Sequence, residues 1–166
     1  GTPRGGGTML DEIEILGEGR TLARAATYLL HPAPTSEAQY ADNRGLLTDG
    51  SLSTTAWTAC VGWNTGTPEV TLDLQRQVPV RLVVAHLVGG GIAGITFPDA
   101  VAVDLSSDGV TWTPAGVSRE RPADGPAPER RSLPMAVRLE TPVAARWLRL
   151  RLERRGWTML HEIEVY

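Results

Sequence analysis

Apolar and polar residues alternate along most of the chain, in short stretches separated by Gly and Pro residues. An alternation with a period of two places apolar side chains on one face of a β-strand and polar side chains on the other. In residues 147–153, for example, Leu148, Leu150 and Leu152 share one face. The pattern predicts strands at 69–74, 80–88, 100–106, 135–139, 147–153 and 159–165.

Helical periodicity is scarce. Residues 16–30 contain some apolar residues at helical spacing, but Gly17 and Gly19 interrupt them, so we predict a turn followed by a strand. Residues 118–131 hold Pro and Gly among charged residues and predict an exposed loop. Several short strands without strand–helix alternation predict an all-β fold, a two-sheet antiparallel β-sandwich with jelly-roll-like closure.

Composition narrows the functional classes. The chain has 166 residues and a formal net charge of -3, so it offers no overall positive field to attract nucleic acid. No apolar run approaches the roughly 18 residues needed to span a membrane, and no basic leader precedes an apolar stretch. We therefore expect neither a nucleic-acid partner nor membrane insertion, and we interpret the chain as a mature or excised segment.

The sequence contains one internal repeat. Residues 8–15 match residues 158–165 at six of eight positions, 150 residues apart. We interpret 1–19 as an N-terminal strand and linker, which the repeat suggests is the tail of an upstream sister module, and 20–166 as the sandwich. The alternative is that both segments are strands of one sheet. On either interpretation the N-terminal strand must pair, within the domain or with a neighbour such as the sister module.

Residues 89–94 match the pattern G-x-G-x-x-G directly after a predicted strand. A dinucleotide-binding fingerprint also needs a helix next, to hold the pyrophosphate at its N-terminus. Another strand pattern follows here instead. The segment is therefore predicted to be a loop between strands, either a flexible connection or one whose bare backbone approaches a ligand.

The residues that often carry catalysis form no recognisable set. His31, His86 and His161 fall on different predicted strands, and no nucleophile motif accompanies a base. His161 is interpreted as structural, in phase with Ile163. His86 shares the phase of its strand and is expected to be hydrogen-bonded and half-buried, although its position before the glycine-rich loop leaves a ligand-binding role open.

Cys60 is the single cysteine, so an internal disulfide is excluded and a buried apolar role is expected.

Residues 107–112 predict a tight hairpin in which Asp-Gly forms a two-residue turn. Residues 46–57 form a loop rich in hydroxyl groups around Asp49. Such a loop suits calcium, which prefers oxygen ligands, but it is equally typical of an ordinary turn.

Several short motifs follow one another over about residues 22 to 166. They are Tyr40-Ala41-Asp42, Leu47-Thr48-Asp49-Gly50, Trp57, Val61-Gly62-Trp63, Val70-Thr71-Leu72-Asp73-Leu74, the 107–112 hairpin, Ala145-Arg146-Trp147-Leu148-Arg149-Leu150 and Glu162-Ile163-Glu164-Val165. In this order the motifs resemble the discoidin or coagulation factor 5/8 C-terminal domain, most closely bacterial family 32 carbohydrate-binding modules.

The resemblance implies a galactose-binding-like sandwich that binds rather than catalyses. Such domains are usually attached to a secreted glycoside-active enzyme or to a surface protein. The family commonly holds a structural calcium ion, for which Asp49 and Glu162 would supply carboxylates, Thr54 or Thr55 a hydroxyl or carbonyl oxygen, and Leu46 a carbonyl oxygen. The family often has an acidic residue where this chain has Ser51, and Asp42 is the candidate replacement.

Sugar binding needs an aromatic ring for the apolar face of a pyranose and polar groups for its hydroxyls. The candidates are Tyr40, Arg44, Trp63, His86 and Trp157, with Trp157 the first choice. The other tryptophans, Trp57, Trp112 and Trp147, are assigned to packing.

The sequence therefore predicts a non-catalytic carbohydrate-binding module that targets a secreted, glycoside-active modular protein to a glycan. The alternatives are a protein or cell-surface interaction module and a structural spacer in an array.

Overall fold

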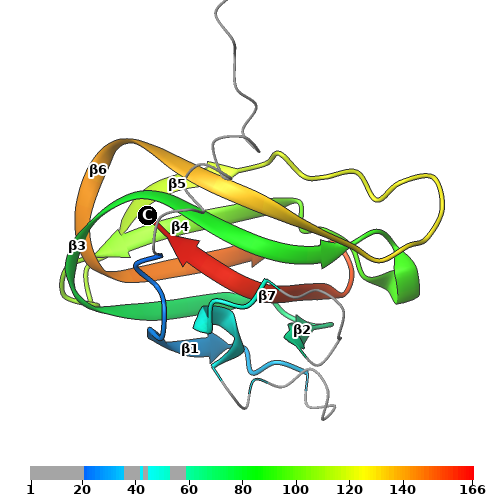
Figure 1. The fold of residues 1–166 in the computed structure, drawn as a ribbon, viewed down its shortest axis with the longest axis horizontal. Helices are drawn as coiled ribbons and strands as arrows, with labels where there is room; N and C mark the ends of the chain where they lie inside the picture. Colours follow the sequence, from blue (N-terminus) through cyan, green and yellow to red (C-terminus); the bar gives the residue numbers. More distant parts are fainter. Residues whose placement is uncertain (1–20, 36–41, 43–44, 53–58) are drawn as a thin grey trace, which may run out of the picture.

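The computed structural model describes residues 21–35, 42, 45–52 and 59–166, and they form an antiparallel β-structure (Figure 1). Its strands are β1 (Thr27–His31), β2 (Val61–Trp63), β3 (Glu69–Gly89), β4 (Ala100–Ser106), β5 (Thr113–Ser118), β6 (Arg131–Glu153) and β7 (Thr158–Val165). The 3₁₀ turns η1 (Leu46–Thr48) and η3 (Ile92–Gly94) lie in connections. Within these described residues, no helix is long and apolar enough to cross a membrane.

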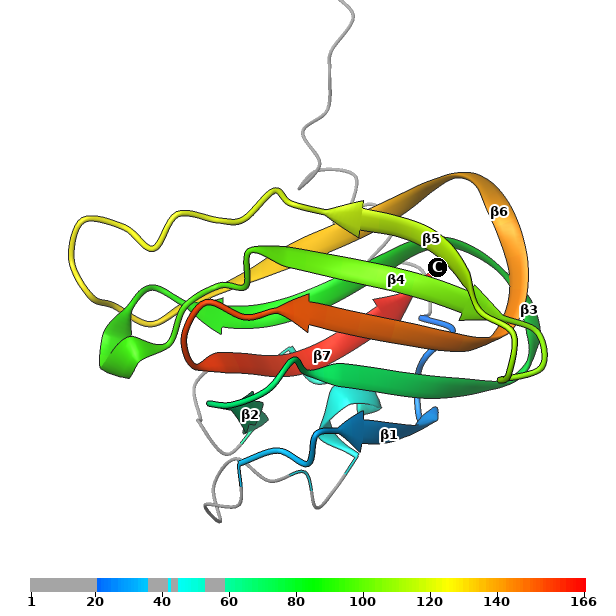
Figure 2. The same ribbon diagram turned by 180° about the vertical axis from the view of Figure 1, so that it is seen from behind.

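The long strands β3 and β6 each contribute to both layers of the sandwich. Residues 69–73 of β3 pair with β1 and with 147–151 of β6, whereas residues 78–89 pair with 131–145 of β6 and, in part, with β7. β4 and β5 extend the first layer, and β2 extends the second beyond β7. Figure 2 shows β3 and β6 bending together at one end, where they pass between the layers. The predicted antiparallel sandwich is confirmed.

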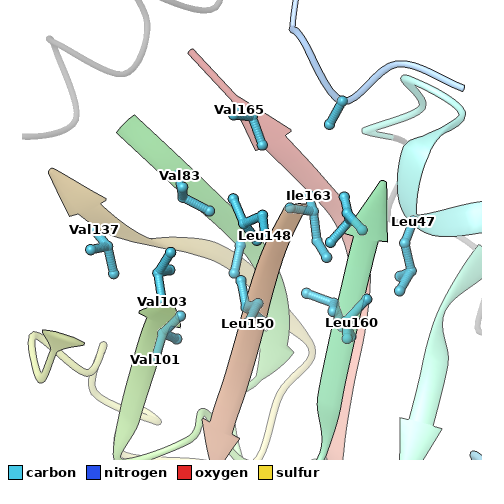
Figure 3. Close-up of a cluster of buried hydrophobic side chains, with 14 of the residues drawn as sticks. Leu47, Val83, Val101, Val103, Val137, Leu148, Leu150, Leu160, Ile163 and Val165 are labelled. Carbon is cyan, nitrogen blue, oxygen red and sulfur yellow. The ribbon is translucent and has the colours of Figure 1, made fainter. Parts of the chain in front are cut away.

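The core lies between the two layers. Figure 3 shows valine and leucine side chains of β4 and of the second half of β6 gathered with side chains of β3 and β7. Val101, Leu148, Leu150, Ile163 and Val165 are each at most 1% exposed. Burying such side chains supplies most of the folding free energy of a sandwich, because each contributes about 1.5–3 kcal/mol.

All six predicted strands lie within strands of the structure, but four of them are halves of two long strands. The predicted segments 69–74 and 80–88 belong to β3, and 135–139 and 147–153 belong to β6. The predicted turn and strand before residue 30 correspond, over the described residues, to the turn at 22–25 and to β1. Residues 119–130 form the predicted loop between β5 and β6.

Two β-bulges change the side-chain phase that the sequence suggested. A register shift between Val80 and Leu82 leaves Val80 in the main core but turns Leu82 to the outer face of the second layer. A second shift, opposite His86, separates His161 from the core phase of Ile163. The expectation that His161 shares a face with Ile163 was therefore wrong, because one extra residue in a strand reverses its faces.

The connection between β4 and β5 also differs from the predicted two-residue turn. It spans residues 107–112, and within it positive φ occurs at Gly109 alone. The Asp108 carboxylate accepts hydrogen bonds from the backbone N–H groups of Val110 and Thr111, both at 2.8 Å. These bonds hold the carboxylate as an anion, and the pKa of Asp108 is lowered to about 2. A longer loop therefore replaces the tight turn.

Candidate functional site

Three connections meet at one end of the sandwich, at the right of Figure 1: residues 90–99 after β3, 119–130 after β5 and 154–157 after β6. We call this the loop end. Trp157 N donates to Gly94 O at 3.1 Å, and Thr96 N donates to Trp157 O at 3.0 Å. Gly90 N donates to an Asp124 carboxylate oxygen at 3.2 Å. The three connections are thus tied into one surface.

The glycine-rich segment is a loop, and β4 follows η3 where a nucleotide-binding fold would have a helix. Gly90 has φ +106°, and a Cβ atom there would lie 1.9 Å from Glu129 O, so only glycine fits. Gly91 has φ +83°, but no atom lies within 4 Å of the corresponding Cβ position. Gly90 is needed because the backbone of Glu129 lies close to it. At Gly91 the space that a side chain would occupy is empty.

Trp157 is half-buried beside this loop. Its ring packs against a small apolar cluster of Cys60, Val88, Ile95 and Met159, which lies outside the main core. A Cβ atom on Gly94 would lie 3.9 Å from the Trp157 ring. The indole is therefore held in place on one side and lies next to bare backbone.

His86 lies two residues before Val88 on the outer face of β3 and is hydrogen-bonded to Glu164. Its Nε2 atom is 2.7 Å from a carboxylate oxygen of Glu164, and the Tyr166 hydroxyl donates to the other oxygen at 2.9 Å. The bond from His86 lowers the pKa of Glu164. His86 is half-buried and hydrogen-bonded as expected, and its orientation is fixed by Glu164.

His161 lies next to His86, with ring centroids 5.6 Å apart. It is 2% exposed, and its Nδ1 atom has no hydrogen-bond partner among the described residues. Burial, followed by the positive charges of His86 and Arg130, lowers the pKa of His161 to about 4. His161 is therefore a buried neutral imidazole at physiological pH.

Trp63 lies in the core, which excludes the predicted role in stacking on a sugar. It is 1% exposed, and its indole N–H donates to Pro32 O at 2.9 Å.

The other described tryptophans make packing contacts. Trp112 lies beneath the Arg149 guanidinium, whose central carbon is 4.4 Å from the Trp112 ring centroid, and Trp147 packs against Gly109. Tyr40, Arg44, Thr54 and Trp57 lie outside the described residues, as does the repeat at 8–15.

A second notable feature is the carboxylate of Glu162, on β7. The residue is fully buried; one oxygen accepts a hydrogen bond from Gly50 N at 3.2 Å, and the other has no partner among the described residues. Desolvation, followed by the negative charges of Asp49 and Glu164, raises the pKa of Glu162 to about 9, against the opposing bond from Gly50. A buried carboxyl with an unpartnered oxygen beside a second carboxylate fits an oxygen-binding cation.

Asp42, the candidate replacement for an acidic residue at position 51, contacts Tyr28 and the start of η1. It accepts a short hydrogen bond from the Tyr28 hydroxyl and a bond of 3.2 Å from Leu46 N. The Tyr28 oxygen in turn accepts from Leu47 N at 3.1 Å, and burial together with Asp42 raises the pKa of Tyr28. Asp42 thus orders the start of η1. Over the described residues, no group of three or more His, Cys, Asp or Glu side chains is arranged to hold a metal.

Sequence reasoning missed Tyr28 and Glu164 as partners of functional candidates. Tyr28 lies on an edge strand, and Glu164 lies within an ordinary alternating pattern. Their partners, Asp42 and His86, are 14 and 78 residues away in the chain. Only the pairing of β3 with β7 brings His86 and Glu164 together.

Comparisons with known proteins agree with this architecture. The model of the F5/8 type C domain family matches residues 32–163. Among curated proteins, no sequence matches the chain. A chitosan-binding module of a chitosanase/glucanase from Paenibacillus sp. IK-5 superposes with a TM-score of 0.57 at 17% identity, covering 89% of this chain and 98% of that module.

Two further solved structures share the fold. A family 32 carbohydrate-binding module of Clostridium perfringens, in complex with GalNAc-β-1,3-galactose, gives a TM-score of 0.61 at 13% identity and covers 89% of this chain and 99% of that one. A fucolectin from striped bass (Morone saxatilis) serum gives 0.59 at 16% identity, with coverages of 88% and 48%. At these identities the likeness establishes the fold.

Proposed function

Because the chain belongs to the F5/8 type C domain family, we propose that it is a non-catalytic carbohydrate-binding module whose glycan site is the loop end. The observation that carries this proposal is the position of Trp157, a half-buried indole tied by two backbone hydrogen bonds to a glycine-rich loop. Structural neighbours named as chitosan-binding and in complex with GalNAc-β-1,3-galactose support carbohydrate as the ligand class.

The chemistry of the loop end suits a sugar. An indole face stacks on the apolar face of a pyranose. The absence of side chains at Gly91 and Gly94 lets a sugar approach their carbonyl oxygens, each of which can accept a second hydrogen bond, whereas their N–H groups already donate to Ile95 O and Gly91 O. His86, held by Glu164, is a polar candidate on the adjoining face. Tyr40 and Arg44 remain sequence-based predictions. The specificity would come from the polar groups, since stacking alone discriminates weakly among sugars.

We also propose a structural calcium ion held by Asp49 and Glu162. Calcium would neutralise the two carboxylates and engage the oxygen of Glu162 that lacks a protein partner. The ion would then link the loop after η1 to β7. Thr54 or Thr55 and the Leu46 carbonyl remain the predicted additional ligands.

A modular, secreted or cell-surface parent protein is the wider context that we propose. The repeat at 8–15 supports it, because its identical positions correspond to residues of β7 with tertiary roles: Leu160 and Ile163 lie in the core, Glu162 binds Gly50 N, and Glu164 pairs with His86. Strand patterning alone does not require those identities, so the repeat favours an upstream sister module. It also keeps a spacer in an array as the second candidate function.

A glycan array tests the proposal directly. The chain should bind a subset of immobilised glycans and release no sugar from them, and Trp157→Ala should lose binding while melting cooperatively. Trp112→Ala removes a half-buried tryptophan outside the loop end and is the matched control, expected to retain binding. Equal binding by wild type and Trp157→Ala would contradict the assigned site, and absence of binding to any glycan would favour the spacer.

A further inference from the structure

A cleft of about 370 Å³ lies on the outer face of the first layer and contains none of the candidate glycan-binding residues. Its lining includes Ala100, Ala102, Val117, Arg119, Arg151 and Arg154. The volume lies within the range of about 300–1,000 Å³ typical of small-molecule sites. We call it the arginine cleft. It shares Arg119 and Arg154 with the connections of the loop end, but it contains none of Gly91, Gly94 and Trp157.

The strand register explains why a hollow forms here. Ala102 of β4 pairs with Arg151 of β6 on one side and with Val117 of β5 on the other. Ala100 pairs with Glu153, and the Arg119 guanidinium makes an ion pair with Glu153 at 3.1 Å. Two methyl side chains therefore form a low apolar floor between longer side chains.

The arginines around this floor are held by protein groups. The Arg151 guanidinium donates to Asp104, whose side chain is 4% exposed and also binds Arg149. The Arg154 Nε atom donates to Gly66 O at 2.8 Å. Each guanidinium carries five N–H donors in a planar fork, so one or two anchoring bonds orient the group without using all of its donors.

The charge of the cleft is opposite to that of the whole chain. Three arginines and one glutamate among the lining residues give it a net charge of +2, in a chain of net charge -3. The Arg119–Glu153 pair is exposed, and exposed ion pairs are weak, so a ligand oxyanion would compete with Glu153 at low cost. Planar guanidinium groups favour carboxylate and sulfate groups.

We infer that the arginine cleft is a second binding site, for an acidic sugar residue. The uronate carboxylate or sulfate ester of that sugar is recognised by Arg119 and Arg151, and its C–H face lies over the floor of Ala100 and Ala102. The hydroxyl group of Thr67, at the rim, supplies a polar contact. The site would let the domain distinguish acidic from neutral glycans.

An NMR titration of the ¹⁵N-labelled chain tests this inference. The probes are tri-galacturonate, a sulfated galactose disaccharide and the matching neutral disaccharide. An acidic probe should shift the backbone amides of Thr67, Ala100, Ala102 and Val117, with an affinity that falls as salt is added. Whichever acidic probe binds identifies the oxyanion. Equal shifts from the neutral disaccharide at these amides, or shifts from all acidic probes confined to Gly91 and Gly94, would overturn the inference.

Two variants separate recognition from general charge attraction. Arg119→Gln should weaken acidic-probe binding by about tenfold, as expected for losing one charge-assisted hydrogen bond. Arg76→Gln removes the same charge from an exposed position at the bend of β3 and should leave the affinity within about twofold. Equal weakening by both variants would overturn the inference. Failure of the loop-end proposal would appear separately, as lack of shifts at Gly91 and Gly94 with neutral sugars.

Discussion

The backbone N–H of Gly50 donates a hydrogen bond of 3.2 Å to the buried carboxyl of Glu162, 112 residues later in the chain. This bond joins the loop after η1 to the last strand of the second layer. The same carboxyl lies beside Asp49 and has a pKa raised from 4.5 to about 9. Its ionisation therefore connects pH, folding stability and the proposed calcium binding.

Without calcium, stability should decrease as pH rises from about 4.5 to about 9. Folding favours the protonated form of Glu162, since its pKa is higher in the folded chain than in the unfolded chain. Stability from this group is therefore fully present below pH 4.5 and lost as pH rises through 9. Calcium should reverse the loss, because the proposed ion would bind the ionised carboxyl. Calorimetry across this interval, with chelator or with calcium, measures both effects.

Glu162→Gln should remove both the pH-dependent decrease and the calcium-induced increase in Tm. Glu164→Gln, on the same strand, is the control and should keep the calcium response, since Glu164 pairs with His86 instead. Identical melting of the wild-type chain with chelator and with calcium would contradict the calcium site.

His161 should make the domain less stable in acid. Its pKa is lowered from 6.5 to about 4 in the folded chain, so the unfolded chain binds the proton more readily. The stability contribution is present above pH 6.5 and is lost as pH falls through 4. His161→Gln should flatten this decrease. Urea unfolding of the Glu162→Gln variant, with and without His161→Gln, measures the loss of stability in acid without the pH effect of Glu162. The same loss of stability in both variants would show that His161 is not responsible.

Neighbouring glycines in the loop end should respond differently to alanine. Gly90→Ala should cost about 1–3 kcal/mol or more, because the new Cβ atom would meet Glu129 O at 1.9 Å. The new Cβ atom of Gly91→Ala would have no atom within 4 Å, so the free energy of unfolding should fall only by the strain of a positive φ, about 1 kcal/mol. Chemical unfolding compares the two. Gly91→Ala should also weaken glycan binding, since its methyl group would enter the proposed site; unchanged binding would exclude close backbone approach there.

The strands were predictable because apolar and polar residues alternate along each segment that has no bulge. Residues 147–153 illustrate this, with three leucines in the core. The outer-face position of His161 was not predictable, since a bulge adds one residue and leaves no mark in the alternation. The resemblance to the family located Asp49 and Glu162, but the unpartnered oxygen of Glu162 depends on burial. The sequence did not distinguish Trp63 from Trp157 as a sugar-binding residue. The packing does, because Trp63 is buried in the core and Trp157 is half-buried at the loop end.

That separation gives a direct prediction for Trp63. Trp63→Ala should lower the free energy of unfolding by about 3–5 kcal/mol, because it removes a fully buried ring and its bond to Pro32 O. Trp63→Phe keeps most of the packing and should bind glycan as the wild-type chain does. Denaturant unfolding and glycan binding of the two variants check this. A stable Trp63→Ala that loses glycan binding would return Trp63 to the site.

Glycan binding at the loop end can be tested residue by residue with an NMR titration of the ¹⁵N-labelled chain, using the glycan that binds best on the array. We expect saturable shifts of the Trp157 indole N–H and of the Gly91 and Gly94 amides, with the sugar unchanged at the end of the titration. Shifts of the core Trp63 indole N–H should be small by comparison. Saturable binding that leaves the loop end unshifted, or conversion of the sugar to a new product, would contradict this expectation.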